Sequence, residues 1–286
     1  MRTLEHDVAG PTADNPYSGN THELIANYLA DPTEEAILHM VDADPARTPT
    51  FALFAKPDYY VSTGGTSCTD TTGSSSSDCV EQDTAYAWDH GDYAAEIDTN
   101  YLGLVGPGVA HLGLDGSPPN AGPSSAGPLS GQTTVPRSGT TGTWIDETDI
   151  RPTVMYLTGL RDDYAEDGRV ITEVLSQPVP GGLGSPQVEQ LGACYKQLNS
   201  SVGEFGTATL EAATAAIEST SAGDTVYATM DQKLARLDQR RDALAEQIKD
   251  ELYQTEFLGG SIHEPQSETQ SCRQLIGYAD HLAVAG

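Results

Sequence analysis

The C-terminal third of the chain carries the pattern that most constrains its fold. Apolar residues recur there at steps of three and four, which places them on one side of an α-helix. The strongest row consists of Met230, Leu234, Leu237, Leu244, Ile248 and Leu252, with Arg241 filling the gap in it. A second row runs from Val188 to Phe205, and a third helix is predicted over about 268–284. We therefore predict an α-helical bundle over residues 187–286.

Four cysteines fall into two pairs by their spacing. Cys194 and Cys272 lie near the ends of two predicted helices, whereas Cys68 and Cys79 bracket a polar segment rich in Ser, Thr and Gly. The sequence thus predicts the disulfides Cys194–Cys272 and Cys68–Cys79, and with them an extracellular or periplasmic location. Four free thiols in a cytosolic protein are the alternative. The first residues lack the apolar core of a signal peptide, so we expect the signal of a secreted protein to precede Met1.

The charge of the chain restricts the partners that it can bind. It has 42 Asp and Glu residues against 14 Lys and Arg residues, a formal net charge of −28. Such a field repels nucleic acid, and a polyanionic substrate would need metal ions to offset it. No segment approaches the ~20 apolar residues of a membrane span. The charges at helical spacing over 231–251 indicate a solvated face, with a partner-binding coiled coil as the alternative. Self-association through the bundle is a further expectation.

The N-terminal part, residues 1–177, contains two apolar segments that have the profile of buried strands. Residues 50–55 and 101–105 are short and apolar and are bounded by Pro or Gly, which predicts strands buried on both faces. Two polar insertions, 62–83 and 115–142, interrupt this part. A Pro- and Gly-rich segment, 178–186, reads as a linker to the bundle.

Helices are predicted between these strands. The first two cover 21–29 and 33–42, with Asp31 as the N-cap of the second. A third covers 154–160, with Asp149 placed to cap it and Gly159 near its end. Alternating strands and helices predict an α/β fold with functional residues at the strand ends.

The sequence Asp89-His90-Gly91-Asp92 is a candidate metal site. Hydrolysis of a phosphoester near neutral pH commonly uses divalent metals held by Asp and His side chains, and His90 and Asp89 supply both types. Asp92 is a candidate for orienting the imidazole of His90. Asp and His are also common in loops, so an ordinary loop is the alternative for all three.

Four segments, taken in order, resemble the C-terminal part of the alkaline phosphatase superfamily. They are FALFAKPDYY at 51–60, His90-Gly91, LVGPGV at 104–109 and TDIRPT at 148–153. The type I phosphodiesterase and nucleotide pyrophosphatase branch is the most similar, and the resemblance covers about residues 20–175. It implies a partial alkaline-phosphatase-like sheet flanked by helices. It also implies a secreted, metal-dependent phosphoester hydrolase that uses Zn²⁺, with Ca²⁺ or Mn²⁺ as alternatives.

The resemblance also implies which residues bind the metal. His90 matches the last metal ligand of the family. A competing alignment makes Asp89 and His90 an internal metal pair and places a later ligand before TDIRPT, where this chain has Glu147 instead of His. His111 is a further candidate, and the alternatives are a rim position for His111 and a solvent-facing or capping role for Glu147.

The hydroxyl nucleophile and the other ligands of the family lie in a preceding stretch. Residues 1–60 contain no apolar strand ending in Asp and no Ser or Thr at a strand-to-helix turn. We therefore expect a C-terminal portion of such an enzyme, inactive on its own. A non-catalytic extracellular binding or structural protein that keeps the scaffold is the alternative function. The sequence identifies neither the substrate nor whether it is a monoester or a diester.

Overall fold

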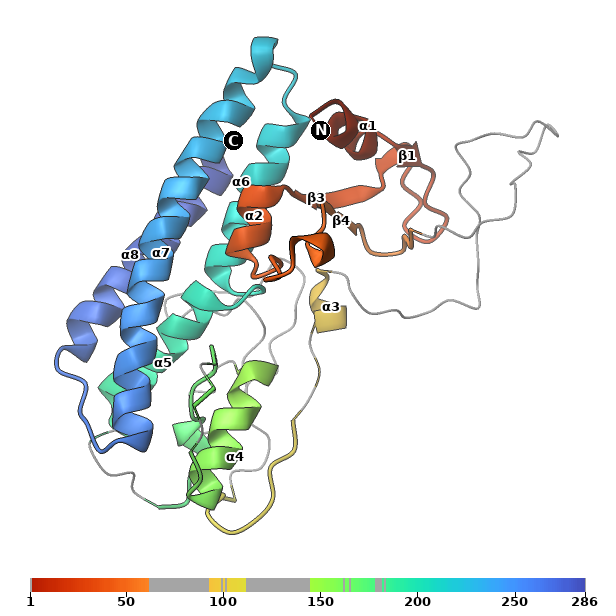
Figure 1. Ribbon diagram of the computed structural model, residues 1–286. Coiled ribbons are helices and arrows are strands. Elements are labelled where there is room, and N and C mark those ends of the chain that lie inside the picture. The colour runs from red at the N-terminus through yellow and green to blue at the C-terminus, as the bar shows by residue number, and fades with distance from the viewer. Residues whose placement is uncertain are drawn as a thin grey trace.

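The computed structural model is dominated by helices, with a smaller N-terminal part packed beside them (Figure 1). It describes residues 2–61, 93–98, 100, 102–111, 145–161, 163–164, 166–177, 182 and 184–285. Cys68, Cys79, both insertions (62–83 and 115–142) and most of the linker lie outside these residues. No helix among the described residues is both long and apolar enough to cross a membrane.

Four helices form the C-terminal bundle. They are α5 (Pro186–Asn199), α6 (Glu204–Glu218), α7 (Thr225–Phe257, preceded by the short 3-10 turn η5, Ala222–Asp224) and α8 (Pro265–Ala285). In Figure 1, α5 and α6 follow one another along the length of α7, and α8 packs against both of them. The row from Val188 to Phe205 was expected to continue as one helix, and this was wrong. The chain turns at Gly203, where a Cβ would lie 2.6 Å from the carbonyl oxygen of Gln197.

The predicted apolar rows form the core of this bundle. Leu191, Leu198 and Ile248 are fully buried, as is the polar Tyr195 ring between them. Burial of each aliphatic side chain of this size contributes roughly 1.5–3 kcal/mol. The predicted disulfide Cys194–Cys272 is confirmed; it joins α5 to α8.

The N-terminal part contains short helices and two antiparallel strand pairs. Its elements are α1 (Arg2–Ala9), β1 (Thr12–Ala13), β2 (Glu23–Leu24), β3 (Ala26–Ala30), α2 (Pro32–Ile37), η1 (Pro45–Arg47) and β4 (Ala52–Ala55). Strand β1 pairs with β2, and β3 pairs with β4 with Leu29 opposite Leu53. Strand β3 and helix α2 lie against the bundle, where Ala30, Ile37 and Leu38 share its apolar core.

Of the two helices predicted over residues 21–42, one is wrong and one is confirmed. The helix expected over 21–29 is wrong, because this stretch forms β2 and β3. Pairing with β4 and a hydrogen bond from Leu29 N to Thr214 Oγ1 of α6, at 3.0 Å, fix β3 as a strand. The helix after Asp31 is confirmed as α2, with the Asp31 side chain accepting from the amides of Thr33 and Glu34. It ends at Ile37 rather than at residue 42, and His39 adopts a positive φ of 57°.

The expected alkaline-phosphatase-like sheet is not formed by the described residues. The strand at 50–55 exists as β4, but it is paired with β3 alone, and three of its four residues are only half-buried. The strand expected at 101–105 is absent from the described residues 102–105, and Val105 is 98% exposed. Pairing begins later, where Val109 forms an antiparallel bridge with Leu175.

The remaining elements follow β4 in the chain and precede α5. They are α3 (Ala95–Asp98), η2 (Glu147–Asp149), α4 (Ile150–Thr158) and η3 (Thr172–Val174). The helix predicted over 154–160 corresponds to α4, which starts earlier and ends at Gly159 in the left-handed conformation, as its sequence indicated. In Figure 1, α4 stands beside the lower half of the bundle, near α5.

Candidate functional site

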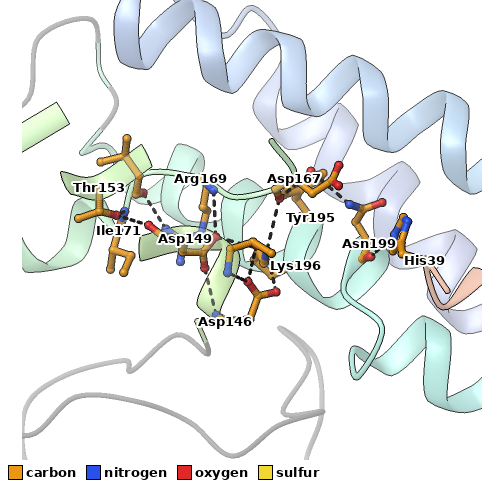
Figure 2. Close-up of polar contacts among 12 residues, drawn as sticks. His39, Asp146, Asp149, Thr153, Asp167, Arg169, Ile171, Tyr195, Lys196 and Asn199 are labelled. Atoms are coloured by element: carbon orange, nitrogen blue, oxygen red, sulfur yellow. Dashed lines mark hydrogen bonds and ion pairs between the residues drawn. The ribbon is translucent and has the colours of Figure 1, made fainter. Parts of the chain in front are cut away.

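The TDIRPT segment is held by the most elaborate polar network among the described residues, shown in Figure 2. Asp146 is the N-cap of η2 and accepts from Thr148 N at 2.9 Å, while Asp149 accepts from Asp146 N at 3.2 Å. The Asp146 side chain also accepts from the backbone of Asp149, and this bond and the one from Asp146 N to Asp149 form a capping box. Asp149 was expected to cap α4 and does not, because its fully buried side chain is turned toward Asp146 and toward residue 169. Its role is thus to anchor the segment.

A second segment, residues 167–171, which we call the strap, is tied to this anchor through its backbone. The amides of residues 169, 170 and 171 donate in turn to Asp149 Oδ1, Glu256 Oε1 and Thr153 Oγ1, each at 2.9 Å. Successive amides thus bind α4 on one side and α7 on the other. The strap approaches η2 so closely that a Cβ on Gly168 would lie 2.0 Å from Thr148 O, and only glycine fits there.

Lys196 of α5 provides the positive charge of the network. Its ammonium group is buried and lies 2.8 Å from Asp146 Oδ2, 3.3 Å from Asp149 Oδ1 and 2.8 Å from Thr148 Oγ1. Burial alone would raise the pKa of Asp146, but the charge and hydrogen bond of Lys196 outweigh it and hold that pKa below its usual value. Asp149 is more deeply buried, and burial raises its pKa even though Lys196 and Arg169 oppose the shift.

Two further buried ionisable side chains lie at the strap. Arg169 forms a bidentate pair with Glu173, with nitrogen–oxygen distances of 2.7 and 2.9 Å. Burial would lower the pKa of Arg169, but the Glu173 carboxylate outweighs it and raises that pKa. Glu256 of α7 is almost fully buried, and burial raises its pKa to about 7. Below neutral pH this carboxyl group is therefore largely protonated.

The network continues along α5 to the end of α2. Tyr195 donates to Asp167 O at 3.0 Å, and Asn199 Nδ2 donates to Tyr195 Oη at 3.3 Å. His39 Nε2 lies 2.8 Å from Asn199 O, and Figure 2 shows these side chains in a row. They line a groove of about 450 Å³, which Lys249 borders on α7. A second hollow, of about 530 Å³, lies between the first turns of α5 and α8.

The predicted metal ligands are placed only in part. Asp89, His90 and Asp92 lie outside the described residues. Glu147 is exposed and accepts from Asn100 Nδ2 at 3.1 Å, and His111 is exposed at the end of segment 102–111. Within the described part of the chain, no three His, Cys, Asp or Glu side chains are arranged to hold a metal ion.

The residue that follows the candidate metal sequence is anchored in the protein. Tyr93 donates through its hydroxyl to Ser201 O in the turn between α5 and α6. Its ring makes edge contacts with Tyr28 of β3 and Phe54 of β4, with centroids 5.7 and 5.4 Å apart. The segment after residue 92 therefore starts at the junction of the strand pair and the bundle.

Sequence reasoning did not single out Lys196, Arg169 or Glu256. One available signal was the stretch 191–199, LGACYKQLN, whose only charge is Lys196. A helix with so few charges is expected to be buried on most sides, and its single charge must then be paired. Arg241, noted as the charge in an apolar row, is likewise buried, at 1% exposure.

Comparison with protein-family models, with curated proteins and with solved structures found no significant match. The alkaline phosphatase resemblance therefore remains a prediction from the sequence motifs.

Proposed function

We propose that this chain is the C-terminal portion of a secreted, metal-dependent phosphoester hydrolase in which His90 and Asp89 bind a divalent metal. The observation that supports the proposal is that LVGPGV pairs with residues 174–176, which follow the strap bound by Asp149 and Thr153 of TDIRPT. Ala110 N donates to Val174 O and Ser176 N to Gly108 O, both at 2.8 Å, beside the strap that holds TDIRPT. Gly108 also meets α4, since a Cβ there would lie 3.0 Å from Leu157 Cδ2.

The other motifs fit the same unit. Phe54, from the FALFAKPDYY motif, contacts Tyr93 directly after the His90 sequence, and Asn100 reaches Glu147 at the start of TDIRPT. The motifs that carry the resemblance flank the His90 sequence on the chain, and residues next to them, Tyr93, Glu147 and Val174, connect them to the rest of the structure.

The described parts of the motifs have structural roles in this proposal. Asp149 and Thr153 hold the strap, and their side chains are engaged in those bonds. The chemistry therefore rests on His90 and Asp89, with Glu147, His111 and Asp92 as lesser candidates. A divalent metal bound there would polarise the phosphoester and offset its charge against the acidic chain.

Calorimetric titration with Zn²⁺ tests this function, with Mn²⁺ and Ca²⁺ as further probes, in 0.5 M NaCl to screen diffuse binding to carboxylates. We expect one stoichiometric site that His90→Ala abolishes and that the control His281→Ala, at an exposed position of α8, retains. Absence of a stoichiometric site, or one indifferent to His90→Ala, would contradict the proposal and favour a non-catalytic structural protein.

A hydrolysis assay tests the second half of the proposal. The isolated chain should not cleave bis-p-nitrophenyl phosphate, because residues 1–60 contain no Ser or Thr at a strand-to-helix turn that could act as the nucleophile. Turnover that a chelator and His90→Ala both abolish would show that this chain carries a complete active site.

A further inference from the structure

Helix α2 carries a carboxyl group in an unusual position. Glu34 is fully buried against the bundle, and both of its carboxyl oxygens lack a hydrogen-bond partner. The nearby hydroxyl of Thr209 on α6 does not satisfy them, because it is turned to the carbonyl oxygens of Phe205 and Gly206, at 3.1 and 3.0 Å. A buried carboxylate without partners costs several kcal/mol, so such a group in a native fold calls for an explanation.

The charges around Glu34 are mainly negative. On its own element, Asp31 caps α2 and the buried Glu35 adjoins it. From α7, Asp238 faces it, and the Tyr93 phenol lies on the side of segment 93–98. Strand β3, which also packs on α2, contributes Tyr28, whose ring contacts Tyr93.

Arg241 of α7 is the positive group in this environment, but its charge is already shared. Its guanidinium lies 2.7 Å from Asp238 and 2.9 Å from Asp242, and 3.1 Å from the His39 ring. An ionised Glu34 would therefore add a further negative charge to a guanidinium that faces two carboxylates. A metal ion does not fit either, since no described cluster of three ligating side chains exists.

A proton is the partner that this environment favours. We propose that α2 is a pH-dependent clasp on the bundle: it stays docked between α6 and α7 while Glu34 carries a proton, and is released when that proton leaves. Release would break the bonds at both ends of the helix. These are Tyr227 Oη to Asp31 Oδ2 at 2.8 Å and Ser201 Oγ to Leu38 O at 2.6 Å.

The direction of the pH effect follows from linkage. Burial first, and then the charge of Asp31, raises the pKa of Glu34 well above its ordinary value of 4.5. The docked helix thus keeps a proton that the undocked helix releases. Docking is strongest below pH 4.5. As pH rises from there toward the pKa of the docked state, the equilibrium constant for docking falls by up to about tenfold per pH unit.

Release of α2 would also change the groove beside α5. His39 lies two residues beyond the end of α2 and lines that groove together with Asn199. Its position is fixed by contacts with Asn199 O and Arg241. The clasp therefore couples pH to the shape of one wall of the groove.

Hydrogen exchange of the full chain between pH 5 and 8, corrected for the intrinsic pH dependence of exchange, tests the clasp. In the wild type, protection of a peptide covering 31–41 should fall by up to about tenfold per pH unit, while the α6 peptide 204–218 keeps its protection. Glu34→Gln removes the titration and should hold the change in 31–41 below twofold. Glu246→Gln, at an exposed position of α7, should behave as the wild type.

Three results would overturn the proposal. The first is protection of 31–41 that does not depend on pH in the wild type. The second is a fall in the protection of 31–41 in Glu34→Gln equal to that in the wild type. The third is a parallel loss of protection in the α6 peptide, which would mean global unfolding. Glu34→Leu serves as a second variant, because it has no polar atoms to bury. If Glu34→Gln fails to fold, Glu34→Leu must show the flat pH response.

Discussion

Replacing Lys196 by methionine isolates the charge that holds the TDIRPT segment. Methionine keeps most of the side-chain volume, and the change leaves Asp149 fully buried without its cation. Without its cation, Asp149 can avoid a buried charge by taking up a proton. At pH 7 this costs a carboxyl group of ordinary pKa about 4 kcal/mol, which is the upper limit of the contribution from Asp149. Asp146 retains 17% side-chain exposure and can recover some hydration. We therefore expect a loss of roughly 3–5 kcal/mol in the free energy of unfolding, as for other broken buried ion pairs.

Urea denaturation at pH 7 measures this loss. With a slope of about 3 kcal/mol per molar urea, the midpoint should fall by roughly 1–1.7 M. Lys249→Met is the matched control: its partners Glu246 and Asp167 are 63% and 52% exposed, so we expect less than about 1 kcal/mol.

The pH dependence gives a second check on the same interaction. The lowered pKa of Asp146 means that the Lys196 interaction stabilises the fold above the ordinary Asp value of 3.8 and is lost as pH falls through the lowered pKa. The difference between wild type and Lys196→Met should therefore shrink in acid. If Lys196→Met is as stable as Lys249→Met at pH 7, the view that this network holds the segment is refuted.

Three further changes have defined outcomes. Glu256 has a pKa of about 7 against an ordinary 4.5, so its stabilising protonation is complete below pH 4.5 and is lost as pH rises to 7. In Glu256→Gln, the melting temperature should no longer fall over this pH range. The part of the pH dependence that this change removes corresponds to at most about 3 kcal/mol. Replacing Cys194 and Cys272 together by serine opens a 78-residue separation and should cost about 4 kcal/mol in urea denaturation; a loss under 1 kcal/mol would contradict this. Gly168→Ala places a Cβ 2.0 Å from a carbonyl oxygen of η2 and should cost at least about 2 kcal/mol in the same assay, whereas the open Gly277→Ala on α8 should not destabilise.

Local signals predicted the parts of the fold that local interactions decide. The apolar row from Met230 to Leu252 predicted α7, because a long helix that buries one side repeats with the helical period. Asp31 and Gly159 mark the ends of α2 and α4 because caps act over two or three residues. The pair Cys194–Cys272 was predicted correctly, but the expected placement near helix ends was wrong, because each cysteine lies in the interior of its helix, α5 or α8.

The errors arose where distant residues decide the structure. Leu24, Ile25, Tyr28 and Leu29 fit a helical face, but β3 is fixed by β4 and by Thr214, 185 residues away from Leu29. Segment 101–105 is apolar enough for a strand, yet its described residues pair with no other segment, and the bridge forms at Val109 instead.

The same limit applies to the candidate site. Asp149 has the residue type and position of a helix cap, and the sequence led to that prediction. Its strongest acceptor role is toward the amide of Arg169, 20 residues later. Lys196 was missed for the same reason, because its partners Asp146 and Asp149 precede it by about fifty residues. The apolar pattern of a helix gives no information on which distant carboxylates will meet its single charge.

X-ray absorption at the zinc edge tests the proposed metal site most directly. The full chain, loaded with one equivalent of Zn²⁺ and freed of excess metal, should show an imidazole nitrogen at about 2.0–2.1 Å in the first shell. That contribution should vanish in His90→Ala and persist in His281→Ala. A first shell of oxygen alone, identical in the wild type and His90→Ala, would contradict the proposal that this chain is part of a metal-dependent phosphoester hydrolase.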